Sequence, residues 1–235
     1  MIVALSFAVL VIATAALFGV RYFARDRGAW LVDASGLIVQ GLIAAALGYV
    51  GQTFFSGQTG MSGPHTRGTI DLPFWAAFVL GFVAIDYAYY WNHRLLHGPL
   101  WRWHAVHHTA SRLDVVVTSR NTIWTPLLIV YVWAGVAAIL LLRDPSGFVL
   151  GLSLTAAPDL WRHSPLIPPP RVRRALAWLL VTPHEHAWHH SRSRMDTNFG
   201  ANFTIWDRLH GTFDGNDETP EQLGLDLPVT LWSPP

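Results

Sequence analysis

The chain alternates between long apolar runs and shorter polar segments. The apolar runs cover residues 2–20, 31–55, 72–92, 124–142 and 146–161. About 20 apolar residues in a helix are enough to cross the hydrocarbon core of a bilayer. The pattern therefore predicts an all-α fold, an integral membrane helical bundle of about four to five spans.

Two of these runs allow a second interpretation. The run at 2–20 could be a signal peptide, but no basic residue precedes it, and Arg21, Arg25 and Arg27 follow it. We therefore expect a retained helix. The run at 146–161 is short enough to re-enter the membrane instead of crossing it.

The arginines indicate how the bundle is oriented, and all 16 basic residues are Arg. If the segment after the first span is inside, the inside segments are 21–30, 93–123 and everything after residue 161. These segments hold 3, 4 and 7 arginines, which is 14 of the 16, and only Arg67 and Arg143 fall outside. This distribution satisfies the positive-inside rule and predicts that the inside segments face the cytoplasm.

Composition supports a membrane protein and removes several other classes. Hydrophobic residues make up 51% of the chain and charged residues 13%, whereas soluble domains average about 25% charged residues. The net charge of +1 argues against nucleic acid as a partner. The chain has no Cys, so it has neither disulfides nor thiolate ligands for a metal.

Histidine carries the chemical signal, with 12 copies concentrated on the predicted inner face. One His-x-x-x-His motif is followed by two His-x-x-His-His motifs, which together supply His93, His97, His104, His107, His108, His186, His189 and His190. On a helix, residues three and four apart are neighbours, so we expect each motif to present its imidazoles in one direction. Neutral imidazole is a common metal ligand, and eight imidazoles exceed the needs of one ion. Two metal ions in a cytoplasmic, His-rich helical cap are therefore predicted.

Four further polar residues lie close to these motifs. His163 follows the fifth run, and we expect it to bind metal too. Asp159, four residues earlier, could be a ligand directly, act through water, or have no role at the metal. His184 points away from its neighbours on a helix and is at most an outer contact. His210 is expected to be structural, and His65 falls on the outer loop.

Two carboxylates are candidates for orienting the histidines. Asp86 lies two helical turns before His93, inside the third apolar run, where a charged residue is functional by default. The alternative is a structural Asp–Arg pair. Asp207 is a second candidate, because a metal-bound His usually donates its other N–H to an acceptor.

Other metal and cofactor chemistries do not fit the sequence. The His-Glu-x-x-His motif of zincins fails, because Trp188 stands where the second His should be. The three Glu residues all lie outside the apolar runs, unlike the glutamates of carboxylate-bound diiron bundles. The sequence contains no P-loop, no dinucleotide fingerprint and no Gly-x-Ser-x-Gly elbow.

Four segments resemble the fatty acid hydroxylase/sterol desaturase superfamily of integral membrane oxygenases. They are DYAYYWNHRLLH (86–97), LWRWHAVHH (100–108), TPHEHAWHH (182–190) and NFGANFTIWDRLHGTF (198–213). The resemblance covers about residues 72–214. It implies a catalytic centre of two iron ions held by the eight motif histidines and by His163, and O2-dependent hydroxylation or desaturation of a lipid. Some members carry a histidine where this chain has Asp159, so the resemblance does not decide the role of that residue.

The resemblance also implies partners and a division of the chain. The lipid substrate would come from the membrane, and electrons from a cytoplasmic donor of the ferredoxin or cytochrome b5 type with its reductase. We predict N-terminal transmembrane helices and an outer loop at 1–70, a catalytic domain at 71–214 and a C-terminal tail at 215–235. The alternative is a non-catalytic or transport-type membrane metal-binding protein. The particular lipid and the oligomeric state stay open, and hydroxylation is favoured over desaturation.

Overall fold

The structure is a computed structural model that describes residues 2–56 and 68–232, and this part of the chain is helical, with isolated β-bridges but no strand. The helices that run along the bundle are α1 (Ile2–Phe18), α2 (Arg27–Ser56), α3 (Phe74–Val79), α4 (Ile85–Leu96), α7 (Val130–Leu141), α8 (Ser146–Leu154) and α9 (Ala156–Arg162). The other α-helices are α5 (Trp101–His104), α6 (Thr125–Leu128), α10 (Pro170–Leu176), α11 (Pro183–His189) and α12 (Ile205–His210). Single helical turns are η1 (Val20–Phe23), η2 (Leu80–Ala84), η3 (His107–Thr109) and η4 (Val117–Ser119). The all-α prediction is confirmed for these residues.

Each predicted apolar run forms one helix or successive helices, and in the fourth run the extended residue Ile129 separates α6 from α7. The third run is one rod, because the π-helical turn η2 joins α3 to α4. The helix of the second run, α2, begins at Arg27, four residues before the apolar run itself. The carboxylate of Asp26 accepts the amide of Ala29 at 2.9 Å there, and it supplies the acceptor that a helix N-terminus needs.

Two helical stretches are long and apolar enough to cross a membrane by length and composition, Arg27–Val50 and Phe74–Leu96. The apolar helices α1 and α7 are shorter. Large apolar side chains are exposed along several helices, including Leu5, Ile12, Leu42, Trp75 and Trp133. Such surfaces fit a lipid environment. The number of crossings stays a prediction.

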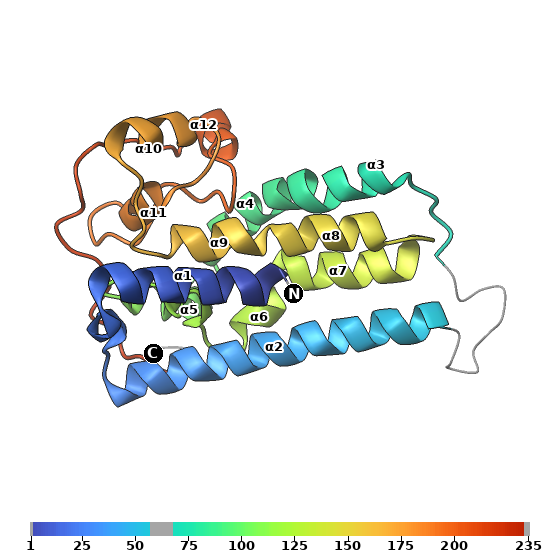
Figure 1. The fold of residues 1–235 in the computed structure, drawn as a ribbon, viewed down its shortest axis with the longest axis horizontal. Coiled ribbons are helices and arrows are strands. Elements are labelled where there is room, and N and C mark those ends of the chain that lie inside the picture. Colours follow the sequence, from blue (N-terminus) through green and yellow to red (C-terminus); the bar gives the residue numbers. More distant parts are fainter. Residues whose placement is uncertain (1, 57–67, 233–235) are drawn as a thin grey trace.

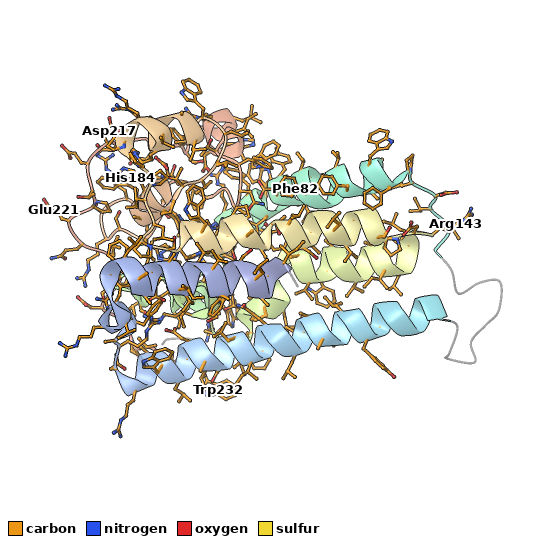
Figure 2. The ribbon with its side chains drawn as sticks, viewed as in Figure 1. Phe82, Arg143, His184, Asp217, Glu221 and Trp232 are labelled. Atoms are coloured by element: carbon orange, nitrogen blue, oxygen red, sulfur yellow. The ribbon has the colours of Figure 1, made fainter. Side chains whose placement is uncertain are left out.

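The long helices lie side by side along the long axis of the molecule, and the short helices α10, α11 and α12 gather at one end (Figure 1). We call this the site end. His184, Asp217 and Glu221 lie there, whereas Arg143 lies at the opposite end (Figure 2). The segments that were predicted to share the inner face thus meet at one end of the bundle. Which side of a membrane this end faces stays a prediction.

Helices α3 and α8 pack with their backbones in close contact. A Cβ atom added to Gly147 would lie 2.2 Å from the carbonyl oxygen of Phe74, and one added to Gly151 would lie 2.5 Å from that of Phe78. Gly81 faces the backbone of Phe148 in the same way. Small residues spaced four apart allow this approach between helices in a membrane. The pair therefore depends on glycine for its spacing.

Substituting leucine for Gly151 is expected to separate α3 from α8 and to lower the free energy of unfolding by about 3 kcal/mol, at the upper end of overpacking costs. Gly41 on α2 is the matched control, because an added Cβ there meets no atom within 4 Å. Unfolding in detergent micelles measures both variants. An equal effect of Gly151→Leu and Gly41→Leu would contradict the packing.

A buried ion-pair network ties the start of α2 to the segment before α6. Asp33 accepts hydrogen bonds from Arg120, from Nε at 2.7 Å and from Nη2 at 2.9 Å, and it also pairs with Arg25. Arg25 in turn pairs with Asp114. All four side chains are almost completely buried. Asp33, which the sequence presents as a polar interruption of an apolar run, is thus a structural anchor.

Candidate metal centre

The nine histidines predicted as ligands converge at the site end as two groups. The first group is His93, His97, His104, His108 and His189. The second group is His107, His163, His186 and His190. Within each group, one ring nitrogen from every residue lies within 4.8 Å of the others. Residues from α4, α5, η3, α9 and α11 thus meet at one place.

Each His-x-x-His-His motif is divided between the two groups. His104 and His108 join the five-residue group, and His107 joins the other, while His186 and His190 join the four-residue group without His189. The expectation that each motif presents its imidazoles in one direction was therefore wrong for these two motifs, whereas His93 and His97 of the His-x-x-x-His motif both join the five-residue group. On a helix each residue turns by about 100°, so residues four apart stay close in direction while adjacent residues diverge. Each His-x-x-His-His motif therefore contributes histidines to both groups.

The distances between ring nitrogens match ligands of a common ion. The Nε2 atoms of His97 and His108 lie 3.0 Å apart, and those of His186 and His163 lie 2.9 Å apart. A metal–nitrogen bond of about 2.1 Å separates two ligands by about 3.0 Å at a right angle and by about 3.4 Å at a tetrahedral angle. These spacings are short enough for the paired nitrogens to bind one ion, and five ligands exceed a tetrahedral shell.

Main-chain acceptors hold the outer ring nitrogens of several of these histidines. Nδ1 of His93 lies 2.8 Å from the carbonyl oxygen of Phe199, and Nδ1 of His189 lies 2.8 Å from that of Thr197. In the second group, Nδ1 of His163 lies 2.8 Å from the carbonyl oxygen of Asp159. A carbonyl can only accept, so each Nδ1 carries the proton, and the Nε2 lone pair points into the group.

Burial keeps these imidazoles neutral. It lowers the pKa of His97 and of His107 to about 3, and for His107 the nearby His189 and Arg162 lower the pKa further. The pKa values of His104, His108, His163, His186, His189 and His190 are lowered well below the usual value for the same main reason. Neutral rings with inward lone pairs are suited to a cation. The two groups therefore fit two transition-metal ions such as iron.

The remaining candidate histidines and Asp159 lie outside both groups. The carboxylate of Asp159 pairs with Arg162 and is 3.7 Å from Nδ1 of His163. The group of Asp159 that accepts from that ring is therefore its main-chain carbonyl. Nε2 of His184 is 2.8 Å from the carbonyl oxygen of Asn216. His210 stacks on two tyrosines and contacts the hydroxyl of Tyr87. His65 lies outside the described residues.

The two orienting carboxylates act through the loop before α12. The carboxylate of Asp86 accepts hydrogen bonds from the main-chain amides of Asn202 and Phe203 and from the indole N–H of Trp206. Among the described residues, it therefore makes neither the predicted contact with a histidine nor an ion pair with an arginine. Asp207 accepts the amide of Phe199 at 2.7 Å. The carbonyl of Phe199 is the acceptor for His93, so Asp207 orients that ring through the backbone of one residue.

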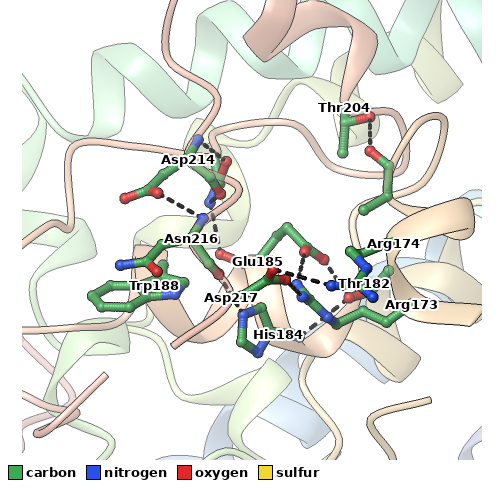
Figure 3. Close-up of polar contacts among 12 residues, drawn as sticks. Arg173, Arg174, Thr182, His184, Glu185, Trp188, Thr204, Asp214, Asn216 and Asp217 are labelled. Carbon is green, nitrogen blue, oxygen red and sulfur yellow. Dashed lines mark hydrogen bonds and ion pairs between the residues drawn. The ribbon is translucent and has the colours of Figure 1, made fainter. Parts of the chain in front are cut away.

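Helix α11 is fixed by polar contacts of residues that are not in the metal groups (Figure 3). The buried carboxylate of Glu185 accepts from the hydroxyl of Thr182 and from Nη1 of Arg173, the latter at 2.8 Å. Thr182 also accepts the amide of His184 and caps the helix. The indole N–H of Trp188 donates to the carbonyl of Glu218. These contacts set the direction in which the α11 histidines point.

Replacing Glu185 with alanine is expected to lower the free energy of unfolding by about 3 kcal/mol, because Arg173 would lose its buried partner. Metal affinity should fall as well, by about 10-fold, because α11 is no longer held. Thermal unfolding and metal titration measure the two effects. Glu221 is exposed at the same end, and Glu221→Ala should change neither quantity.

The C-terminal segment crosses both His-x-x-His-His motifs. The amide of Gly224 donates to the carbonyl of His190 at 3.2 Å, and the next amide, from Leu225, donates to the carbonyl of His108 at 2.7 Å. These are the last histidines of the two motifs. The sequence indicates no role for the tail at 215–235, because main-chain hydrogen bonds leave no pattern of residue types. The tail is thus a clamp on the site.

Alanine in place of Gly224 is expected to loosen this clamp. Gly224 has a φ of 79°, and an added Cβ would lie 2.7 Å from backbone atoms of Ala110 and Ser111. Gly211→Ala is the control, because Gly211 has a φ of 70° but no atom within 4 Å of the added Cβ. Both variants bear a backbone strain of about 1–3 kcal/mol, and only Gly224→Ala should also lose metal. Equal metal loss from both would contradict the clamp.

An apolar cavity of about 360 Å³ reaches the metal groups from the bundle. Its polar end is lined by histidines of both groups, among them His93, His107 and His186. Its walls come from α1, α2, α7 and α8, with Ile43 and Leu152 among the lining residues. A second pocket, of about 550 Å³, reaches the five-residue group at His97. The groups are thus open to an apolar chain on one side.

Known proteins share the part of the chain that carries this site. The profile of the fatty acid hydroxylase family matches residues 78–212, which include all nine histidines. Alkylglycerol monooxygenase from Homo sapiens is 29% identical over 157 residues, covering 65% of this chain and 34% of that protein. Ornithine lipid hydroxylase from Rhizobium tropici is 34% identical over 158 residues, covering 65% of this chain and 45% of that protein.

A third relative is named for a different reaction. Very-long-chain aldehyde decarbonylase from Oryza sativa is 27% identical over 170 residues, covering 64% of this chain and 25% of that protein. The chain thus spans less than half the length of these relatives, and no solved structure matches it. The match covers the helices and loops that carry both metal groups. The chain belongs to the fatty acid hydroxylase family.

Proposed function

We propose that the chain is a membrane-bound oxygenase that uses two iron ions and O2 to hydroxylate a C–H bond of a lipid. One observation carries this proposal. Histidines of both groups line the same cavity whose walls are apolar helices. A cavity of that kind can hold a hydrocarbon chain against the metal groups and exclude water from them.

The histidines would hold one ion in each group. When bound, the irons supply the O2 activation that an unactivated C–H bond requires and that no side chain can supply. The main-chain carbonyls of Phe199, Thr197 and Asp159 keep the Nδ1 protons in place, so that Nε2 remains the ligand atom. The apolar wall orients the substrate by contact along its length.

Two relatives favour oxygen insertion over desaturation, because they are named a monooxygenase and a lipid hydroxylase. Hydroxylation places one oxygen atom of O2 in the lipid and the other in water. The balance requires two electrons and two protons. We propose that a cytoplasmic carrier of the ferredoxin or cytochrome b5 type supplies the electrons at the site end.

The arginines of the site end give little support to docking of an acidic carrier. Arg174 pairs with Asp217, Arg192 with Asp226 and Arg194 with Asp214. The charge of these arginines is therefore largely balanced within the chain. The chemistry of the carrier stays a proposal that depends on the reaction and not on this surface.

Oxygen labelling tests the proposed reaction. Membranes that contain the chain, a reductase system and ¹⁸O2 are expected to yield a lipid that carries one ¹⁸O atom, detected by mass spectrometry. Membranes with the His186→Ala variant should yield none. A lipid that loses two hydrogens without gaining label would indicate desaturation instead. Metal movement across vesicles without any changed lipid would favour a transport protein and contradict the proposal.

A further inference from the structure

Two hydroxyl groups in the cavity have no hydrogen-bond partner. Tyr131 on α7 and Thr118 in η4 both line the cavity. Their oxygen atoms are buried, and neither has a hydrogen-bond partner among the described residues. A buried polar atom without a partner costs about 1–3 kcal/mol. Such a pair in one cavity requires an explanation.

The other hydroxyls of the cavity wall are already bonded. The hydroxyl of Thr125 donates to the carbonyl of Trp103 at 2.7 Å, and that of Thr155 donates to the carbonyl of Leu152 at 2.7 Å. The remaining wall is mostly apolar, with Leu47 and Val132 among its residues. Among the hydroxyl groups of the wall, those of Tyr131 and Thr118 are therefore available to bind a polar atom inside the cavity.

Both hydroxyl-bearing residues line the same cavity as histidines of both metal groups. The ring of Tyr131 stacks on Tyr89 at 4.9 Å, and the ring of Tyr89 lies 5.3 Å from that of His93. Thr118 is two residues before Arg120, whose carbonyl is 3.3 Å from Nδ1 of His107. Tyr131 is thus linked through one intervening ring to the five-residue group, and Thr118 lies two residues along the chain from a contact of the four-residue group. A polar atom held by them would lie at the metal end of the cavity.

We propose that the hydroxyls of Tyr131 and Thr118 bind an oxygen atom of the substrate, and that the oxidised carbon lies next to this polar group. The inference rests on the proposed function and specifies its substrate as an alcohol or ether lipid that enters with its oxygen at the metal end. A lipid that entered with its terminal methyl group first would leave both hydroxyls unpartnered. The long apolar part then occupies the space between α1, α2 and α7.

Binding tests this recognition without turnover. The probes are radiolabelled 1-hexadecanol and hexadecane, bound to the full chain in detergent micelles. The double variant Tyr131→Phe/Thr118→Val should bind 1-hexadecanol about 10-fold less tightly, the combined loss of two hydrogen bonds. Its affinity for hexadecane should stay unchanged. Unchanged affinity for both probes would overturn the inference and would indicate that water alone satisfies these hydroxyls.

Matched controls separate recognition from folding. Tyr49 is 69% exposed on α2, and Thr219 is exposed near the C-terminus. The double variant Tyr49→Phe/Thr219→Val removes the same atoms outside the cavity and should bind both probes as wild type does. Metal content equal to wild type shows that the cavity variant is folded. An equal loss of 1-hexadecanol binding in both double variants would count against the two cavity hydroxyls.

The position of the new hydroxyl distinguishes this inference from the proposed function. In the iron-loaded wild type, oxidation of 1-hexadecanol is expected within about three carbons of the oxygen, located by fragmentation in mass spectrometry. Oxidation at the far end of the chain would overturn the inference and leave the proposed function intact. Selective binding of 1-hexadecanol without oxidation of any lipid would support the recognition and count against the oxygenase.

Discussion

Replacing His186 with alanine is expected to remove one of two bound metal ions and to lower lipid oxidation at least ~100-fold. His186 lies in the four-residue group, with its Nε2 atom 2.9 Å from that of His163 and 3.1 Å from that of His190. Substituting the residues that merely orient metal ligands lowers affinity or activity about 10–100-fold, so loss of a ligand should exceed that. The five-residue group should keep its ion. Metal analysis and the labelled-oxygen assay measure the two effects.

A second substitution tests the division into two groups. His104→Ala should remove the ion of the five-residue group and leave that of the other group. The control is His65, which is predicted to lie on the outer loop. It is outside the described residues, and His65→Ala should keep both ions. A single shared ion would be indicated if either His104→Ala or His186→Ala emptied the site completely.

Replacing Asp33 with alanine is expected to lower the free energy of unfolding by about 3–5 kcal/mol. Asp33 is completely buried and is paired with both Arg25 and Arg120, so the substitution leaves two buried arginines with one carboxylate, Asp114. The carbonyl of Arg120 is an acceptor for His107. Metal affinity should therefore fall together with stability, although Asp33 lies outside the part matched by the family profile.

An exposed ion pair at the opposite end is the control for Asp33. Asp71 and Arg143 pair at 3.0 Å, and their side chains are 70% and 59% exposed. Asp71→Ala should change stability by about 0–1 kcal/mol and leave metal affinity unchanged. Unfolding in detergent micelles compares the two variants. A similar loss from Asp33→Ala and Asp71→Ala would show that the buried network does not stabilise the site end.

The ligand candidates could be found from sequence because metal binding demands a rare residue at fixed spacing. All nine predicted histidines lie in the two groups, and the apolar runs mark the helices that carry them. Their division between the groups could not be predicted, because it depends on how α5 leads into η3 and on how α11 approaches α9. The spacing of the histidines in the sequence does not determine which imidazoles share a group.

The supporting contacts could not be found because most of them involve the main chain. The acceptors for His93, His163 and His189 are carbonyl groups, which every residue possesses. The clamp through Gly224 and Leu225 has the same character. Asp159 was left open, and the structure places its carboxylate against Arg162. The carboxylate of Asp159 drew attention in the sequence, but the group that contacts His163 is the main-chain carbonyl of Asp159.

The number of iron ions bound per chain tests the central claim most directly. Purified wild-type protein, loaded with iron and freed of loosely bound metal, would be measured by mass spectrometry of the metal against quantitative amino-acid analysis. The two histidine groups predict two iron ions per chain. A value of one or less in protein shown to be folded would contradict the claim that each group holds an ion.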